Sequence, residues 1–98
     1  MANLDASQVA QLAVRVGLLT PDQATESLAE AGTNEGGEGL VKHLERKGWL
    51  TPWQSQKLLK GERDGYFLGG YKLLYLISKG SFGRVYRAED QQTGTVVA

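Results

Sequence analysis

The chain contains one seven-residue stretch twice, as Gly17-Leu18-Leu19-Thr20-Pro21-Asp22-Gln23 and, 31 residues later, as Gly48-Trp49-Leu50-Thr51-Pro52-Trp53-Gln54. In each copy a glycine can end one helix, and the threonine, proline and glutamine can begin the next as N-cap, first helical residue and capping-box partner. The repeat therefore predicts two helix-turn-helix hairpins. Two copies are too few for a solenoid, so we expect a compact four-helix domain over residues 1–60.

Apolar spacing places the helices between these signals. Val9, Leu12 and Val16 follow the helical period, and Asp5 with Gln8 three residues later forms a capping box ahead of them. Four glycines between residues 32 and 39 would each cost about 1 kcal/mol of helix stability relative to alanine, which predicts a loop there. The expected helices cover residues 6–16, 21–31, 40–47 and 52–60.

The period changes after residue 60. Residues 61–70 contain four glycines and no apolar period, which is typical of a linker. Residues 71–77 and 83–88 are rich in aromatic and β-branched residues and predict two strands, and a turn at 90–94 leads toward a third. Because a hairpin that no helix covers is marginal alone, we expect residues 71–98 to be incomplete and disordered and the fold class to be all-α.

Composition excludes several function classes. The 98 residues carry 11 basic and 11 acidic side chains, so the net positive charge that favours nucleic acid is absent and no nucleic-acid partner is expected. No cysteine and one histidine leave no means for a disulfide, a thiolate metal site or a cysteine nucleophile. The apolar runs are too short to span a membrane and the N-terminus does not resemble a signal peptide. We expect a soluble, cytoplasmic chain.

One segment carries specific chemistry, Ile77-Ser78-Lys79-Gly80-Ser81-Phe82-Gly83-Arg84-Val85. Its glycines would let backbone N–H groups approach phosphate oxygens without a β-carbon in the way. Together with Tyr71 to Ala88 and Val96-Val97-Ala98, the segment resembles the opening of a eukaryotic-type serine/threonine protein kinase domain, of the kind found in planctomycete-like bacteria. The same two glycines could also belong to an ordinary hairpin of a non-catalytic module.

The kinase resemblance implies a nucleotide site in which the loop covers the phosphates of ATP, with magnesium as the metal. Gly80 and Gly83 would be the second and third loop glycines, with Ser81 and the loop tip Phe82 between them and Lys79 directly before Gly80. Ser78 stands where the family has its first glycine. Ile77 and Val85 would cover the adenine, and Val97 and Ala98 match the Val-Ala pair before the conserved lysine.

That lysine would come two residues after Ala98, and the αC glutamate, the His-Arg-Asp loop and the Asp-Phe-Gly metal ligand of the family are also missing from the sequence. The resemblance therefore implies an N-terminal kinase fragment that is inactive by itself. The whole kinase would phosphorylate serine or threonine on protein substrates. No residue of this chain is predicted to be catalytic or to bind metal.

Residues 1–60 allow three interpretations. The first is an accessory domain that docks another protein. The second is a cyclic-dinucleotide sensor, because Val14 to Thr20 followed by a helix resembles the N-terminal hairpins of secretion and pilus ATPases. The third is regulation of the kinase domain through a short linker, which would hold the two parts at high effective concentration.

Three side chains of the helical half invite a functional interpretation. His43 has no second histidine or cysteine with which to bind a metal, so it is assigned no role. Trp49 and Trp53 flank the second helix start and are expected to bury against the first and third helices; if exposed, they would be anchors for a partner. The bases between Lys42 and Lys60 are expected to stabilise helix ends.

Overall fold

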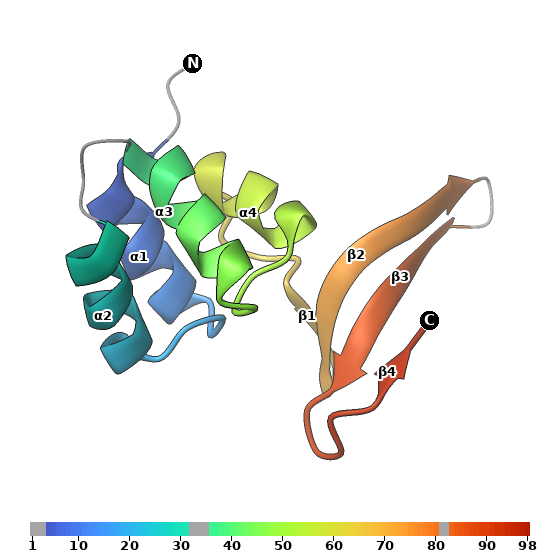
Figure 1. The fold of residues 1–98 in the computed structure, drawn as a ribbon. Helices are drawn as coiled ribbons and strands as arrows, with labels where there is room; N and C mark the ends of the chain where they lie inside the picture. The colour runs from blue at the N-terminus through green and yellow to red at the C-terminus, as the bar shows by residue number, and fades with distance from the viewer. Residues whose placement is uncertain (1–3, 32–35, 81–82) are drawn as a thin grey trace. The chain divides into compact units, whose positions relative to one another are not determined.

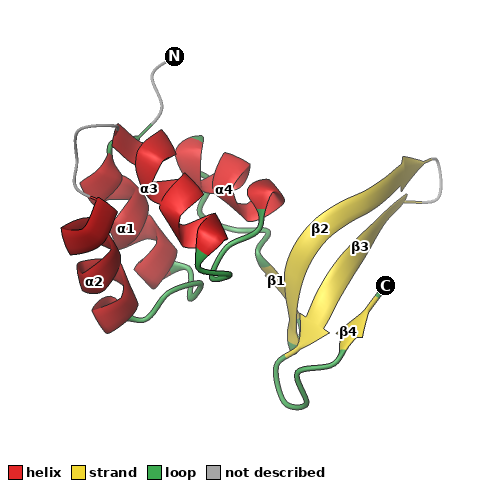
Figure 2. Ribbon diagram, in the orientation of Figure 1, coloured by secondary structure: helices red, strands yellow, loops and turns green. Residues whose placement is uncertain are grey.

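The computed structural model describes residues 4–31, 36–80 and 83–98. The chain divides into two compact units, Met1–Arg63 and Asp64–Ala98. The first contains helices α1 (Ala6–Arg15), α2 (Pro21–Ala31), α3 (Gly36–Arg46) and α4 (Pro52–Leu59), and the second contains strands β1 (Phe67–Leu68), β2 (Tyr71–Gly80), β3 (Gly83–Asp90) and β4 (Val96–Val97) (Figure 1). Figure 2 shows this separation of helix from strand along the chain.

The four helices begin and end close to where the repeated stretch predicts. The side chains of Asp5, Thr20 and Thr51 each accept a hydrogen bond from the backbone N–H three residues on, at 2.8, 3.1 and 3.1 Å. In each case the side-chain oxygen of the glutamine at that position accepts a hydrogen bond from the backbone N–H of the cap residue. Gly17 and Gly48 take positive φ, 90° and 79°, where α1 and α3 stop. The capping-box and glycine-stop predictions are confirmed.

The core of the helical unit follows the same repeat. Positions 31 residues apart are buried in both copies, as Val9 with Leu40, Ala10 with Val41, Ala13 with Leu44, and Leu19 with Leu50. α1 packs against each of the other three helices. Because each hairpin presents the same apolar positions, the two cover each other.

The loop predicted over residues 32–39 is wrong from Gly36 onward, since α3 begins there. Gly37 is buried, and a β-carbon on it would overlap the carbonyl oxygen of Leu4 and lie 2.9 Å from Cγ2 of Val9. The absence of a side chain thus lets α3 approach α1 closely. This packing offsets the intrinsic cost of glycine in a helix.

The expectation of an all-α fold with a disordered hairpin is also wrong. Residues 64–98 contain an antiparallel sheet in the order β1-β2-β3-β4, so the chain is a mixed α/β protein. β2 and β3 pair from Tyr71 opposite Asp90 to Gly80 opposite Gly83. β1 lies within the stretch expected to be a linker and pairs with the start of β2, while β4 pairs with the end of β3. The two short strands extend the hairpin that the sequence predicts into a sheet.

Candidate functional site

The glycine-containing loop of the sequence lies at the end of the β2–β3 hairpin. Gly80 pairs with Gly83 in the last rung, next to Lys79 opposite Arg84. Gly83 has a backbone φ of 117°, a conformation that residues with a β-carbon rarely adopt. Ser81 and Phe82, predicted to form the loop tip, lie outside the described residues. The hairpin thus carries Ser78, Lys79, Gly80 and Gly83 to one exposed end of the sheet.

The side chains expected around an adenine are only partly brought together. Val85 and Ala98 line one open cavity of about 460 Å³, although they lie 13 positions apart in the chain. Ile77 does not line this cavity, and 57% of its surface is exposed. Ile77 falls at an irregularity of the β2–β3 pairing, between Leu76 and Ser78. Such an irregularity turns a side chain away from the regular alternation of the strand.

Other side chains complete the cavity. Leu73, which is buried, Tyr86 and Ala88 contribute apolar surface, and Arg84 contributes a cation. The sequence did not single out Arg84 or Tyr86 as site residues, although both flank Val85 in β3. The cavity therefore offers apolar surface next to a cation.

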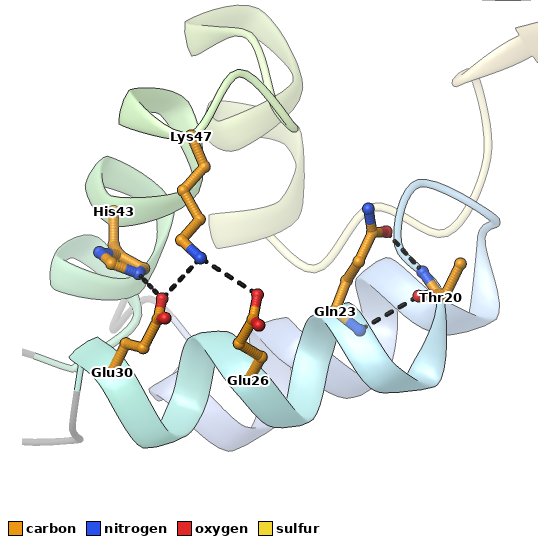
Figure 3. Close-up of polar contacts among 6 residues, drawn as sticks. All are labelled: Thr20, Gln23, Glu26, Glu30, His43 and Lys47. Carbon is orange, nitrogen blue, oxygen red and sulfur yellow. Dashed lines mark hydrogen bonds and ion pairs between the residues drawn. The ribbon is translucent and has the colours of Figure 1, made fainter.

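A second polar constellation, shown in Figure 3, joins α2 to α3. Glu30 accepts hydrogen bonds from Nε2 of His43 at 2.9 Å and Nζ of Lys47 at 2.6 Å, and Glu26 pairs with Lys47 at 3.1 Å. The pKa of Glu30 is lowered, and the largest cause is the hydrogen bond from Lys47, followed by the hydrogen bond from His43. The same bond raises the pKa of Lys47. His43, given no role by sequence, thus links two helices.

The two tryptophans are neither buried nor freely exposed. Each is half-buried beneath a lysine, with Nζ of Lys47 at 4.6 Å from the ring centre of Trp49 and Nζ of Lys57 at 5.3 Å from that of Trp53. These are cation–π distances. The expectation that both rings are buried in the core is therefore wrong, because one face of each ring lies beneath a lysine ammonium group.

No group of three or more histidine or acidic side chains that could hold a metal ion occurs in the part of the chain that the structure describes. Within the same residues, no helix has the length and apolar character needed to cross a bilayer.

Comparisons with protein-family models, with curated proteins and with solved structures gave no match to this chain. The glycine-containing motif and the geometry of its hairpin are therefore the features that bear on function.

Proposed function

We propose that residues 64–98 are the beginning of the ATP-binding lobe of a serine/threonine protein kinase, and that the helical unit is its accessory domain. The observation that supports this most directly is the cavity shared by Val85 and Ala98. The kinase resemblance assigns Val85 to the cover of the adenine and matches Ala98 to the Val-Ala pair that precedes the family's lysine in the same nucleotide site. The pairing of β4 with β3, which sets Val97 opposite Ala88, brings the end of the chain beside Val85 on the sheet.

The loop contributes the second part of the proposed site. Backbone N–H groups around Gly80 and Gly83 would bind the phosphates of ATP, and among the residues that the structure describes none beyond the chain neighbours comes within 4 Å of a β-carbon built on either glycine. Phosphate oxygens could therefore approach the backbone from outside the hairpin. Lys79 and Arg84, paired across the strands beside the loop, would add positive charge next to the phosphates.

Phosphate transfer itself would need groups beyond this chain. The sequence contains no His-Arg-Asp or Asp-Phe-Gly motif, the two motifs that supply the catalytic base and a magnesium ligand in the family. The proposed role of these 98 residues is thus to bind and orient ATP, and the whole kinase would transfer the terminal phosphate to serine or threonine of a protein.

A titration with magnesium-ATP, followed by amide resonances, tests the nucleotide site. The expected result is a saturable shift of Gly83, Val85 and Ala98 that Val85→Ala weakens. Val96→Ala is the matched control, because Val85 and Val96 are 47% and 46% exposed on the same sheet and only Val85 lines the cavity. Equal loss in both variants, or shifts spread over the helical unit instead, would contradict the proposed site.

The coding sequence after Ala98 gives an independent test. The proposal requires a lysine two residues on and a His-Arg-Asp motif further along the same frame. If that frame continues without both, the kinase assignment is wrong, whatever the hairpin binds.

A further inference from the structure

A second pocket, in the helical unit, has the chemistry of an anion site. It lies between α1 and the residues that follow α4, and its volume is about 210 Å³. Arg15, at the end of α1, and Arg63, after α4, both line it, although 48 positions separate them in the sequence. Gln8 and Gln11 add amide groups, and Leu4 and Leu12 add apolar surface.

Both guanidinium groups are uncompensated in the described part of the chain. No hydrogen bond or ion pair joins Arg15 or Arg63 to another described residue. Of the two acids that flank Arg63 in sequence, Glu62 pairs with Nζ of Lys57 at 2.6 Å and Asp64 is exposed, while Asp5 caps α1. A chain of zero net charge thus places two unpaired cations at one small pocket.

The size and charge of the pocket select one kind of ligand group. Drug-sized and nucleotide ligands occupy pockets of about 300–1,000 Å³, so about 210 Å³ suits a single group. A phosphate monoester carries nearly two negative charges at neutral pH, whereas a carboxylate carries one. Guanidinium groups bind phosphate oxygens through paired hydrogen bonds. Two arginines therefore match one phosphate monoester in charge and in donors.

An adjoining groove indicates what the phosphate is attached to. Gln11 and Arg15 also line a groove between α1 and α2, of about 440 Å³, whose other walls include Val14, Ala24 and Leu28. The phosphate pocket and the apolar groove thus meet on one face of α1. A free phosphate would leave the groove empty, whereas a peptide with an apolar residue next to its phosphorylated one would fill both.

The geometry points to a docking site for a phosphorylated serine or threonine of a protein partner, with the phosphate between Arg15 and Arg63 and a neighbouring apolar side chain in the α1–α2 groove. This site does not depend on the proposed kinase function, because neither ATP nor catalysis takes part in it.

A peptide titration of the 98-residue chain tests the site. The probe is a short capped peptide with phosphoserine flanked by leucine, and arginine Nε–H resonances are the readout. We expect Arg15 and Arg63 to shift with saturation, and the unphosphorylated peptide to bind at least about tenfold more weakly. Inorganic phosphate alone should also bind more weakly than the phosphopeptide. Equal binding of the two peptides, or equal binding of inorganic phosphate and phosphopeptide, would overturn the proposal.

Variants separate this pocket from general attraction to positive charge. Arg15→Gln and Arg63→Gln should each weaken the phosphopeptide at least about tenfold. Arg46→Gln removes the same charge from another exposed position of the helical unit that lines neither pocket, and should leave binding unchanged. If all three variants weaken binding alike, the pocket is not the site. Arg15→Lys, which keeps the charge and loses the paired hydrogen bonds, should bind with intermediate affinity, and circular dichroism checks that each variant is folded.

Discussion

The helical and sheet units differ in how far their apolar side chains are buried. Among the described residues, most of the buried apolar side chains lie in α1–α4 and the turns between them, and Leu44 and Leu58 have no exposed surface. Every large apolar side chain that is exposed lies in the sheet unit, as Leu68, Tyr71, Tyr75, Ile77, Val85, Val96 and Val97. The helical unit is thus a closed core, whereas the sheet presents apolar surface of the kind that a ligand or a further layer of protein covers.

The difference follows from how each kind of element buries surface. The helical hairpins are two copies of one pattern, and each copy supplies the apolar face that the other needs. A sheet has two faces and needs another layer on at least one of them. Four strands, two of them only two residues long, supply no such layer from within the unit.

The largest change in stability is expected when a core side chain of the helical unit is removed. Leu44→Ala should lower the free energy of unfolding of the helices by about 3 kcal/mol, because it leaves a cavity in a closed core. Ile77→Ala, at a 57% exposed position of the sheet, should change stability by less than about 0.5 kcal/mol. Urea unfolding followed by circular dichroism measures both. Similar losses in the two variants would show that the sheet buries Ile77 in solution.

Adding one methyl group compares the packing of glycines in the two units. Gly37→Ala should destabilise the helices by about 2 kcal/mol, because its β-carbon meets the backbone of Leu4 and the side chain of Val9. Gly70→Ala meets no atom within 4 Å and serves as the control in the sheet. Thermal unfolding of the two variants measures the difference. A neutral Gly37→Ala would mean that α3 and α1 are less closely packed than the structure shows.

A smaller effect is expected from the helix caps. Thr51→Ala removes the hydroxyl that accepts from the N–H of Gln54 at 3.1 Å, and should cost about 1 kcal/mol. Thr25→Ala is the matched control, because the Thr25 hydroxyl bonds back to the carbonyl of Pro21 within α2 and alanine favours helix there. The same loss in both variants would argue that threonine contributes through packing and not through the cap.

The smallest effect concerns pH and the contact between α2 and α3. The pKa of Glu30 is lowered below its usual value of 4.5, so the stabilisation is complete above about pH 4.5 and is lost as the pH falls through the lower, folded-state pKa. Glu30→Gln should remove this acid-side dependence, whereas Glu45→Gln, on α3, should retain it. Thermal unfolding from about pH 2 to about pH 6 measures the dependence. An unchanged pH profile in Glu30→Gln would contradict the role given to this carboxylate.

For Lys47 we expect stability to be lost as the pH rises, the opposite direction to the loss expected for Glu30. Its pKa is raised above 10.5 by the hydrogen bond to Glu30, so its contribution is complete below about pH 10.5 and is lost as the pH rises through the folded-state pKa. Lys47→Met should therefore flatten the alkaline side of the stability profile and leave the cap at Thr51 unaffected. Because these side chains are partly exposed, added salt should reduce both effects.

Elements were predictable where their signals lie within a few residues. The capping boxes at Asp5, Thr20 and Thr51 and the glycine stops at Gly17 and Gly48 each depend on groups three to six positions apart, and all were read from the sequence. The strands β2 and β3 were likewise indicated by composition. The all-α class failed because the pairings of β1 and β4, which extend the hairpin, involve strands of only two residues and carry almost no pattern.

The repeated hairpins of the helical unit and the glycine-bearing hairpin of β2 and β3 could be predicted from the sequence, because local backbone preferences and capping bonds select both. Tertiary contacts, by contrast, were needed to include Gly36 and Gly37 in a helix, to bring His43 and Lys47 to Glu30, and to place Val85 with Ala98 at one cavity and Arg15 with Arg63 at another. In each of these groups the partners that meet lie 13 or more positions apart in the chain, and this includes Gly37 with Leu4 and Val9. Their proximity results from how whole elements pack, which no local pattern encodes.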